Sequence, residues 1–145
     1  MSGQPVPGPI VVAAPSQMHD TILAARRAGR RVGFVPTMGA LHAGHASLVE
    51  RAAAECDDVV VSIFVNPKQF GPREDLDRYP RTLPADLALL GSHGARWVFV
   101  PEASSVYPPG HATSVVVSAP AADFEGAIRP GHFAGVATVV CWLFH

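Results

Sequence analysis

Two histidines three positions apart carry the clearest chemical signal in this sequence. His42 and His45 flank the dipeptide Ala43-Gly44, directly after the glycine-containing run 36–41. Their imidazoles can donate hydrogen bonds to phosphate oxygens and offset the negative charge that builds up when the α-phosphate of a nucleotide is attacked. Both histidines are therefore candidate catalytic residues of a nucleotide site.

The segment around these histidines has the pattern of a strand, a turn and a helix. Residues Arg31 to Val35 are predicted to form a buried strand, because the run is short, apolar and stopped by Pro36. Apolar residues then recur at three and four positions, which predicts a helix from Ala46 to Glu55. The N-terminus of such a helix presents unpaired N–H groups and partial positive charge, so it is suited to bind a phosphate chain.

Two other interpretations of the histidine pair stay open at this point. Histidines three apart can share a metal ion, although no third ligand lies nearby and the predicted helix begins only after the second histidine. A strand-to-helix turn also needs glycine and tolerates histidine without any catalytic role. The four-residue pattern alone does not decide between a nucleotide site, a metal site and a structural turn.

The amide residues Asn66 and Gln69 form a second candidate site. Asn66 follows a β-branched apolar run, and ligands of open parallel sheets bind outside the carboxyl ends of the strands. An amide both donates and accepts, so Gln69 can bind a hydroxyl and a carboxylate together. The alternative is that Asn66-Pro67 is turn chemistry and Gln69 is solvated.

Composition indicates a folded enzyme-sized domain and excludes several partners. The chain has 145 residues, of which 48% are hydrophobic and 16% charged, enough for a substantial core. The net charge of −1 provides no basic surface for nucleic acid. No run has the length of a membrane span and the proline-rich start does not resemble a signal peptide, so we expect a cytoplasmic protein without a membrane partner. Cys56 and Cys141 are expected to be reduced core thiols.

Strands and helices alternate along the chain, which predicts parallel βαβ units. Residues 1–9 are proline-rich and expected to be flexible. The further predicted strands are Ile10 to Ala13, Val59 to Val65, Trp97 to Val100 and Ser114 to Val117. The further predicted helices run from a Ser16 cap to about Ala28, from Pro84 to His93, and from Phe133 to Phe144.

Three sequence blocks, taken in order, resemble the pantothenate synthetase (pantoate–β-alanine ligase) family of the nucleotidylyltransferase superfamily. They are PTMGALHAGHASLV at 36–49, VSIFVNPKQFGPREDLDRYPRT at 61–82 and FEGAIRPGHFAGVATVV at 124–140. The resemblance implies an α/β fold with the Rossmann-like parallel sheet of HxGH nucleotidylyltransferases. It assigns residues 10–145 to an incomplete nucleotide-binding domain, with the C-terminal part of the fold and the C-terminal domain missing.

The resemblance also implies an activity, its substrates and its site residues. The reaction is the ATP-dependent condensation of (R)-pantoate with β-alanine to pantothenate through pantoyl adenylate, with Mg²⁺. The implied ATP-binding residues are Pro36, Thr37, Met38, Gly39, Ala40, Leu41, His42, Ala43, Gly44 and His45. The implied pantoate-binding residues are Gln69, Asn66 and His132, and Gln69 also serves β-alanine. Asp86 resembles an acidic position near the metal, but its expected acidic neighbour is Ala85.

Members of the resembled family continue past the third block. They carry a Gly-Glu-Lys-Asp segment and a Ser-Ser-Arg loop that this sequence lacks. The lysine, serines and arginine of these segments are further phosphate donors of the family. Because the loss of one preorganised donor costs about 3 kcal/mol, we expect little or no turnover from this polypeptide alone. We also expect the apolar end at 142–145 to be exposed. The family implies a homodimer and leaves the state of this chain open. The alternatives are another HxGH nucleotidyltransferase or a nucleotide-binding remnant without catalysis.

Overall fold

A parallel four-stranded sheet is the centre of the fold. The computed structural model describes residues 7–118 and 131–145. The strands are hydrogen-bonded in the order β1-β4-β3-β2, and every neighbouring pair is parallel. Their bounds are β1 Ile10–Val12, β2 Val32–Thr37, β3 Asp58–Ile63 and β4 Trp97–Phe99.

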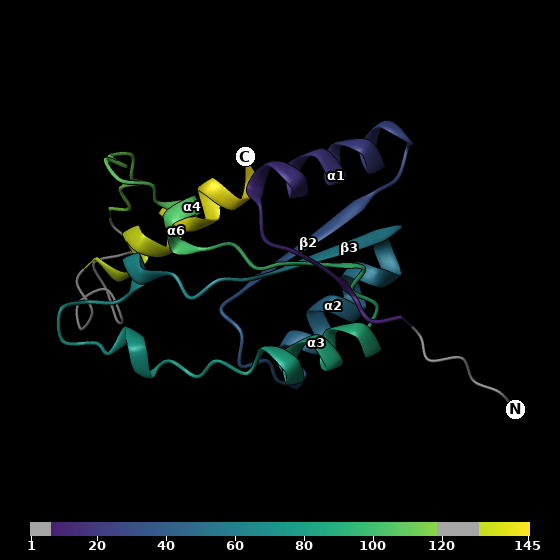
Figure 1. Cartoon of the computed structure of the whole chain (residues 1–145), viewed down its shortest axis with the longest axis horizontal. Coiled ribbons are helices and arrows are strands. Elements are labelled where there is room, and N and C mark those ends of the chain that lie inside the picture. The colour runs from purple at the N-terminus through teal and green to yellow at the C-terminus, as the bar shows by residue number, and fades with distance from the viewer. Residues whose placement is uncertain (1–6, 119–130) are drawn as a thin grey trace, which may run out of the picture. The chain divides into compact units, whose positions relative to one another are not determined.

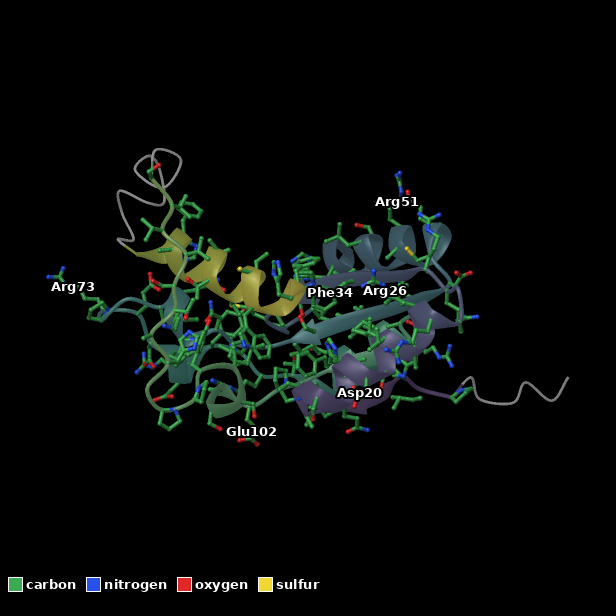
Figure 2. The ribbon with its side chains drawn as sticks, turned by 90° about the horizontal axis from the view of Figure 1, so that it is seen from above. Asp20, Arg26, Phe34, Arg51, Arg73 and Glu102 are labelled. Carbon is green, nitrogen blue, oxygen red and sulfur yellow. The ribbon has the colours of Figure 1, made fainter. Side chains whose placement is uncertain are left out.

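Helices cover both faces of this sheet, as right-handed crossovers require. The step from β1 to β2 crosses the sheet in one direction through α1, whereas the steps from β2 to β3 and from β3 to β4 run in the other direction through α2 and α3. Figure 1 accordingly shows α1 on one side of the strands and α2 with α3 on the other. In Figure 2, Asp20 of α1 and Arg51 of α2 point away from the sheet on opposite sides. The helix bounds are α1 Pro15–Arg27, α2 Ala43–Glu55 and α3 Leu83–Ser92.

The core lies around the two central strands. Val59 and Val61 of β3 and Val98 of β4 are almost completely buried, and they pack with Val49 of α2 and Leu90 of α3. A strand covered on both faces has to be apolar along its whole length, which is why β3 reads as a continuous apolar run. The predicted α/β architecture with parallel strands is therefore confirmed.

The predicted strand at Arg31 to Val35 is longer than expected. β2 continues through Pro36 to Thr37, and Pro36 is paired in register with Ser62 of β3. Proline lacks an N–H group but is tolerated on an edge strand, where that group would face away from the sheet. β2 is such an edge strand, so proline does not end it.

Two predicted helix starts are wrong. Ser16 does not cap α1: the cap position is Ala14, and Pro15 occupies the first turn, where its missing N–H has no intrahelical partner to lose. α2 begins at Ala43 instead of Ala46, because the side chain of His42, at the cap position, accepts from the Gly44 N–H group in the first turn.

The expected strand from Ser114 to Val117 does not form. The N–H group of Val115 donates to the Thr138 hydroxyl at 2.9 Å instead of joining a sheet, and Val116 is 87% exposed. The apolar pattern is typical of a strand, but the Val115 N–H group bonds to a side chain and not to a neighbouring strand. Cys56 and Cys141 are free thiols as predicted, but neither is a core residue, since Cys56 is half-buried and Cys141 is exposed.

The chain divides into two compact units. The first comprises residues 1–64 and 80–101 and contains the sheet with α1, α2 and α3. The second comprises residues 65–79 and 102–145. Its elements are the short helices η1 Pro67–Gln69, η2 Leu76–Arg78 and α4 Ala103–Val106, and the helix α6 His132–Phe144. Residues 1–6 of the expected flexible start, and residues 124–130 of the third sequence block, lie outside the described residues. None of the helices in the described segments has the length and apolar character needed to span a bilayer.

Candidate active site

The histidine turn caps helix α2 with imidazole nitrogens. The His42 ring accepts a hydrogen bond from the Gly44 N–H group at its Nδ1 atom, at 3.0 Å. The His45 ring accepts from the His42 N–H group, also at Nδ1, at 3.2 Å. This is the reciprocal geometry of a capping box, in which each of two side chains satisfies a backbone N–H at the helix start.

These bonds determine where the imidazole protons are. A nitrogen that accepts from an N–H group carries no proton, so each neutral ring is protonated at Nε2. The two Nε2–H groups have no hydrogen-bond partner in the part of the chain that the structure describes. The ring centroids are 4.1 Å apart, with 49° between the ring planes. Together with the positive end of α2, the two rings can therefore offer paired donors to an anion.

The charge state of His45 suits this role. Partial burial lowers the pKa of His45 from its ordinary value of 6.5, and the charge of His42 acts in the same direction. The negative charge of Asp86 opposes the shift. His45 is consequently a neutral Nε2–H donor at physiological pH.

Asp86 holds the loop that leads into the histidine turn. Its side chain is buried, and its Oδ2 and Oδ1 atoms accept from the N–H groups of Ala40 at 3.0 Å and Leu41 at 2.9 Å. The Thr82 hydroxyl donates to Oδ1 at 3.1 Å. The loop needs this anchor because Gly39 and Ala40 both have positive φ angles, of 82° and 51°. The N–H groups of Ala40 and Leu41 therefore face Asp86, and a phosphate would have to displace it to bind them.

The same contacts bear on the expected metal site. Three of the lone-pair positions of the Asp86 carboxylate are taken by protein donors, and the group is only 3% exposed. Within the described residues, no three His, Cys, Asp or Glu side chains gather in a way that could hold a metal ion. The described side chains alone thus do not form a protein-held Mg²⁺ site, and the metal role predicted for Asp86 is not carried into the proposed function.

The second unit brings together the three residues predicted to bind pantoate. The buried Asn66 donates through Nδ2 to Gln69 Oε1 and to the Gly135 carbonyl, both at 3.0 Å. The His132 ring contacts the Gln69 carbonyl oxygen through Nδ1 at 3.1 Å, and since a carbonyl only accepts, Nδ1 is the donor. The Nε2 amide group of Gln69 keeps both its N–H groups without a partner within the described residues.

Two residues of this cluster were not found from the sequence. The Tyr107 hydroxyl donates to Asn66 Oδ1 at 2.7 Å, and nothing in the sequence around it suggested a contact 41 positions away. Gly135 lets α6 approach η1, since a Cβ atom built there would be 2.0 Å from the Lys68 carbonyl oxygen. A glycine inside an otherwise apolar helix was a usable sign of such close packing.

A sequence profile of the pantoate-beta-alanine ligase family matches residues 10–145. The chain belongs to this family. The pantothenate synthetase of Deinococcus radiodurans is 62% identical over 126 residues, covering 87% of this chain and 44% of that protein. The pantothenate synthetase of Roseiflexus castenholzii is 64% identical over 114 residues, covering 79% and 41%. The chain spans about half the length of these pantoate–β-alanine ligases.

Solved structures of the ligase family share the fold. Pantothenate synthetase from Thermus thermophilus superposes with a TM-score of 0.80 at 51% identity, covering 93% of this chain and 48% of that one. Pantoate–β-alanine ligase from Francisella tularensis, complexed with β-γ ATP and β-alanine, gives a TM-score of 0.85 at 41% identity, covering 94% and 52%. The Rossmann-like, nucleotidylyltransferase-type fold expected from the sequence is thus confirmed.

Proposed function

We propose that this chain provides the ATP- and pantoate-binding part of a pantothenate synthetase. The reaction joins pantoate to β-alanine at the expense of ATP: the pantoate carboxylate attacks the α-phosphate, pyrophosphate leaves, and the amine of β-alanine then displaces AMP from the pantoyl adenylate. The observation that carries the proposal is the double histidine cap of α2, which leaves two Nε2–H donors at a helix N-terminus. The Francisella relative, complexed with β-γ ATP and β-alanine, supports it.

The histidines would act on the phosphates. A carboxylate that approaches a triphosphate brings two anions together, so the barrier is largely electrostatic. His45 and His42 would donate from Nε2 to phosphate oxygens without having to reorganise, because their Nδ1 atoms are already fixed by the backbone. Removing one preorganised donor of this kind typically costs about 3 kcal/mol, a hundredfold or more in rate. Residues 36–41 would line the nucleotide, with the loop held in place by Asp86.

The second unit would hold the acid. Gln69 has an Nε2 amide group on the side away from Asn66, and this group can donate to the hydroxyl and the carboxylate of pantoate, and later to the carboxylate of β-alanine. His132 donates from Nδ1 to the backbone carbonyl of Gln69. The Nε2 atom of His132 is then left to contact the substrate. Asn66 is fully engaged within the protein, so its contribution to pantoate binding would be indirect.

Further expectations accompany this proposal. ATP would bring Mg²⁺ on its phosphate oxygens, and no step of the mechanism is assigned to the ion. The partners are the small molecules pantoate, β-alanine and ATP, with no nucleic acid or membrane. Homodimerisation and a cytoplasmic location stay predictions from the sequence and its family resemblance.

The proposal is tested by measuring ATP binding and AMP formation with single-histidine variants. Calorimetric titration of the chain with ATP should give saturable binding, weakened about tenfold or more in His42→Ala and His45→Ala. His19→Ala is the matched control, because His19 is exposed on α1. Its ATP affinity should match that of the unmodified chain.

A second measurement follows the chemistry. AMP release with pantoate, ATP and β-alanine should depend on all three substrates wherever turnover is detected. Equal ATP affinity in His45→Ala and the unmodified chain would refute the assignment of the phosphate site.

A further inference from the structure

Tyr107 is a half-buried donor that the mechanism so far does not use. It follows helix α4, and its hydroxyl donates to Asn66 Oδ1 at 2.7 Å. Burial raises the pKa of Tyr107 to about 12, so the phenol keeps its proton at any physiological pH. The tyrosine therefore acts on Asn66 as a permanent hydrogen-bond donor.

All hydrogen-bonding positions of Asn66 are occupied. Its Oδ1 atom accepts from Tyr107 at 2.7 Å and from the Lys68 N–H group at 3.3 Å. Its Nδ2 atom donates to Gln69 Oε1 and to the Gly135 carbonyl. The bond from Tyr107 is the shortest of the four, and the Lys68 bond is long enough to be weak. Tyr107 and the Gly135 carbonyl thus hold the amide from opposite ends and prevent it from flipping.

The orientation of Asn66 determines that of Gln69. Because Nδ2 of Asn66 is a donor, it selects the oxygen of the Gln69 carboxamide, and the Gln69 Nε2 group must point away from Asn66. A flipped Gln69 would set two N–H donors against each other. The substrate would then meet an acceptor in place of a donor, which is unsuitable for a carboxylate.

We propose that Tyr107 is a positioning residue for substrate binding, which acts through Asn66 to keep the amide N–H groups of Gln69 directed at the carboxylate and hydroxyl of the acid substrate. The inference rests on the proposed function, in which Gln69 binds pantoate. It changes the expected role of Asn66 from a direct contact to a relay. Tyr107 itself does not touch the reacting atoms.

Tyr107→Phe isolates the hydroxyl from the rest of the side chain. The ring remains, and with it the contact to the Lys68 ammonium group, which lies 4.7 Å from the ring centroid. We expect the pantoate affinity of the Tyr107→Phe chain to fall about tenfold, as for loss of a hydrogen bond to a buried amide, and ATP affinity to change less than about twofold. Lys68→Met is the matched control: it removes the cation–π contact and leaves the hydroxyl bond, so pantoate affinity should be kept.

A double-mutant cycle tests whether the effect passes through Asn66. If it does, Tyr107→Phe weakens pantoate binding in the unmodified chain but not in an Asn66→Ala background. Equal losses in both backgrounds would overturn the relay. The Gln69→Ala variant distinguishes a failure of the proposed pantoate site from a failure of the Tyr107–Asn66 relay. If it leaves pantoate affinity unchanged, the proposed function fails, whereas a loss in Gln69→Ala without a loss in Tyr107→Phe rejects the relay alone.

Side-chain amide signals in ¹⁵N-labelled protein provide a readout that needs no substrate. In the unmodified chain, the Asn66 amide protons should exchange slowly because both are hydrogen-bonded. Tyr107→Phe should shift the Asn66 and Gln69 amide signals and speed their exchange, while backbone signals of the sheet stay in place. Unchanged Asn66 and Gln69 signals in a folded Tyr107→Phe chain would overturn the proposal, even if the chain bound no pantoate.

Discussion

Replacing Gly135 by alanine should separate helix α6 from the segment that carries Gln69. The added Cβ atom would lie 2.0 Å from the Lys68 carbonyl oxygen, 2.4 Å from the Lys68 carbonyl carbon and 2.9 Å from the Gln69 nitrogen. All three are backbone atoms, so no side-chain rotation relieves the clash. Reaching even a tight 3.0 Å contact with the oxygen requires a displacement of about 1 Å between α6 and η1.

The expected magnitude has two opposing parts. Alanine favours a helix over glycine by about 1 kcal/mol, which stabilises the variant. Overpacking costs about 1–3 kcal/mol, and the displacement also breaks the bond from Asn66 Nδ2 to the Gly135 carbonyl, which costs a further 1–3 kcal/mol or so for a buried amide. The net expectation is a loss of about 1–5 kcal/mol in the free energy of unfolding.

Urea unfolding followed by tryptophan fluorescence measures this loss, because Trp142 lies in α6 itself. Gly71→Ala is the control in the same unit: a Cβ atom at Gly71 meets nothing within 4 Å, and its φ angle is not positive. The control should unfold like the unmodified chain. A Gly135→Ala chain as stable as this control, or more stable, would show that α6 does not pack closely against η1, and the reasoning would be refuted.

Two further predictions concern the nucleotide loop and its histidines. Asp86→Asn should weaken ATP binding about tenfold and lower stability by about 1–3 kcal/mol, because an amide nitrogen cannot accept from the Ala40 or Leu41 N–H group. Asp20→Asn, at an exposed position of α1, is the control in calorimetry and urea unfolding, and equal behaviour of the two variants would contradict the anchoring role. The pKa of His45 is lowered in the folded chain, so its contribution to stability is present above the unfolded value of 6.5 and is lost as the pH falls through the folded value. Unfolding free energies measured from about pH 7.5 to about pH 5 should therefore fall less steeply for His45→Gln than for the unmodified chain, and identical slopes would exclude this linkage.

The sequence predicted the sheet because its strands are buried on both faces. The apolar runs of β3 and β4 predict strands with both faces covered, and Val60 and Val98 are indeed completely buried. The histidine turn was also predicted, although the start of α2 was not. Sequence rules for helix starts look for serine, threonine, aspartate or asparagine, whereas here two imidazoles perform the capping.

Long-range side-chain bonds explain most of what the sequence could not predict. Asn66 and Gln69 were predicted to face the substrate together, but the Tyr107 hydroxyl that donates to Asn66 lies 41 positions away in the chain. Val115 likewise finds its partner in Thr138, 23 residues further on. Periodicity describes which face of an element is buried, and it contains no information about pairs of this kind.

The proline in edge strand β2 has a consequence for association between chains. The Thr37 carbonyl accepts from the Phe64 N–H group, so Thr37 faces β3 and the backbone nitrogen of Pro36 faces outward. An intruding strand would find no donor at that point and would meet the pyrrolidine ring instead. Pro36, which is expected to line the nucleotide, would therefore also hinder amyloid-like addition of strands from other chains at the exposed edge of the sheet.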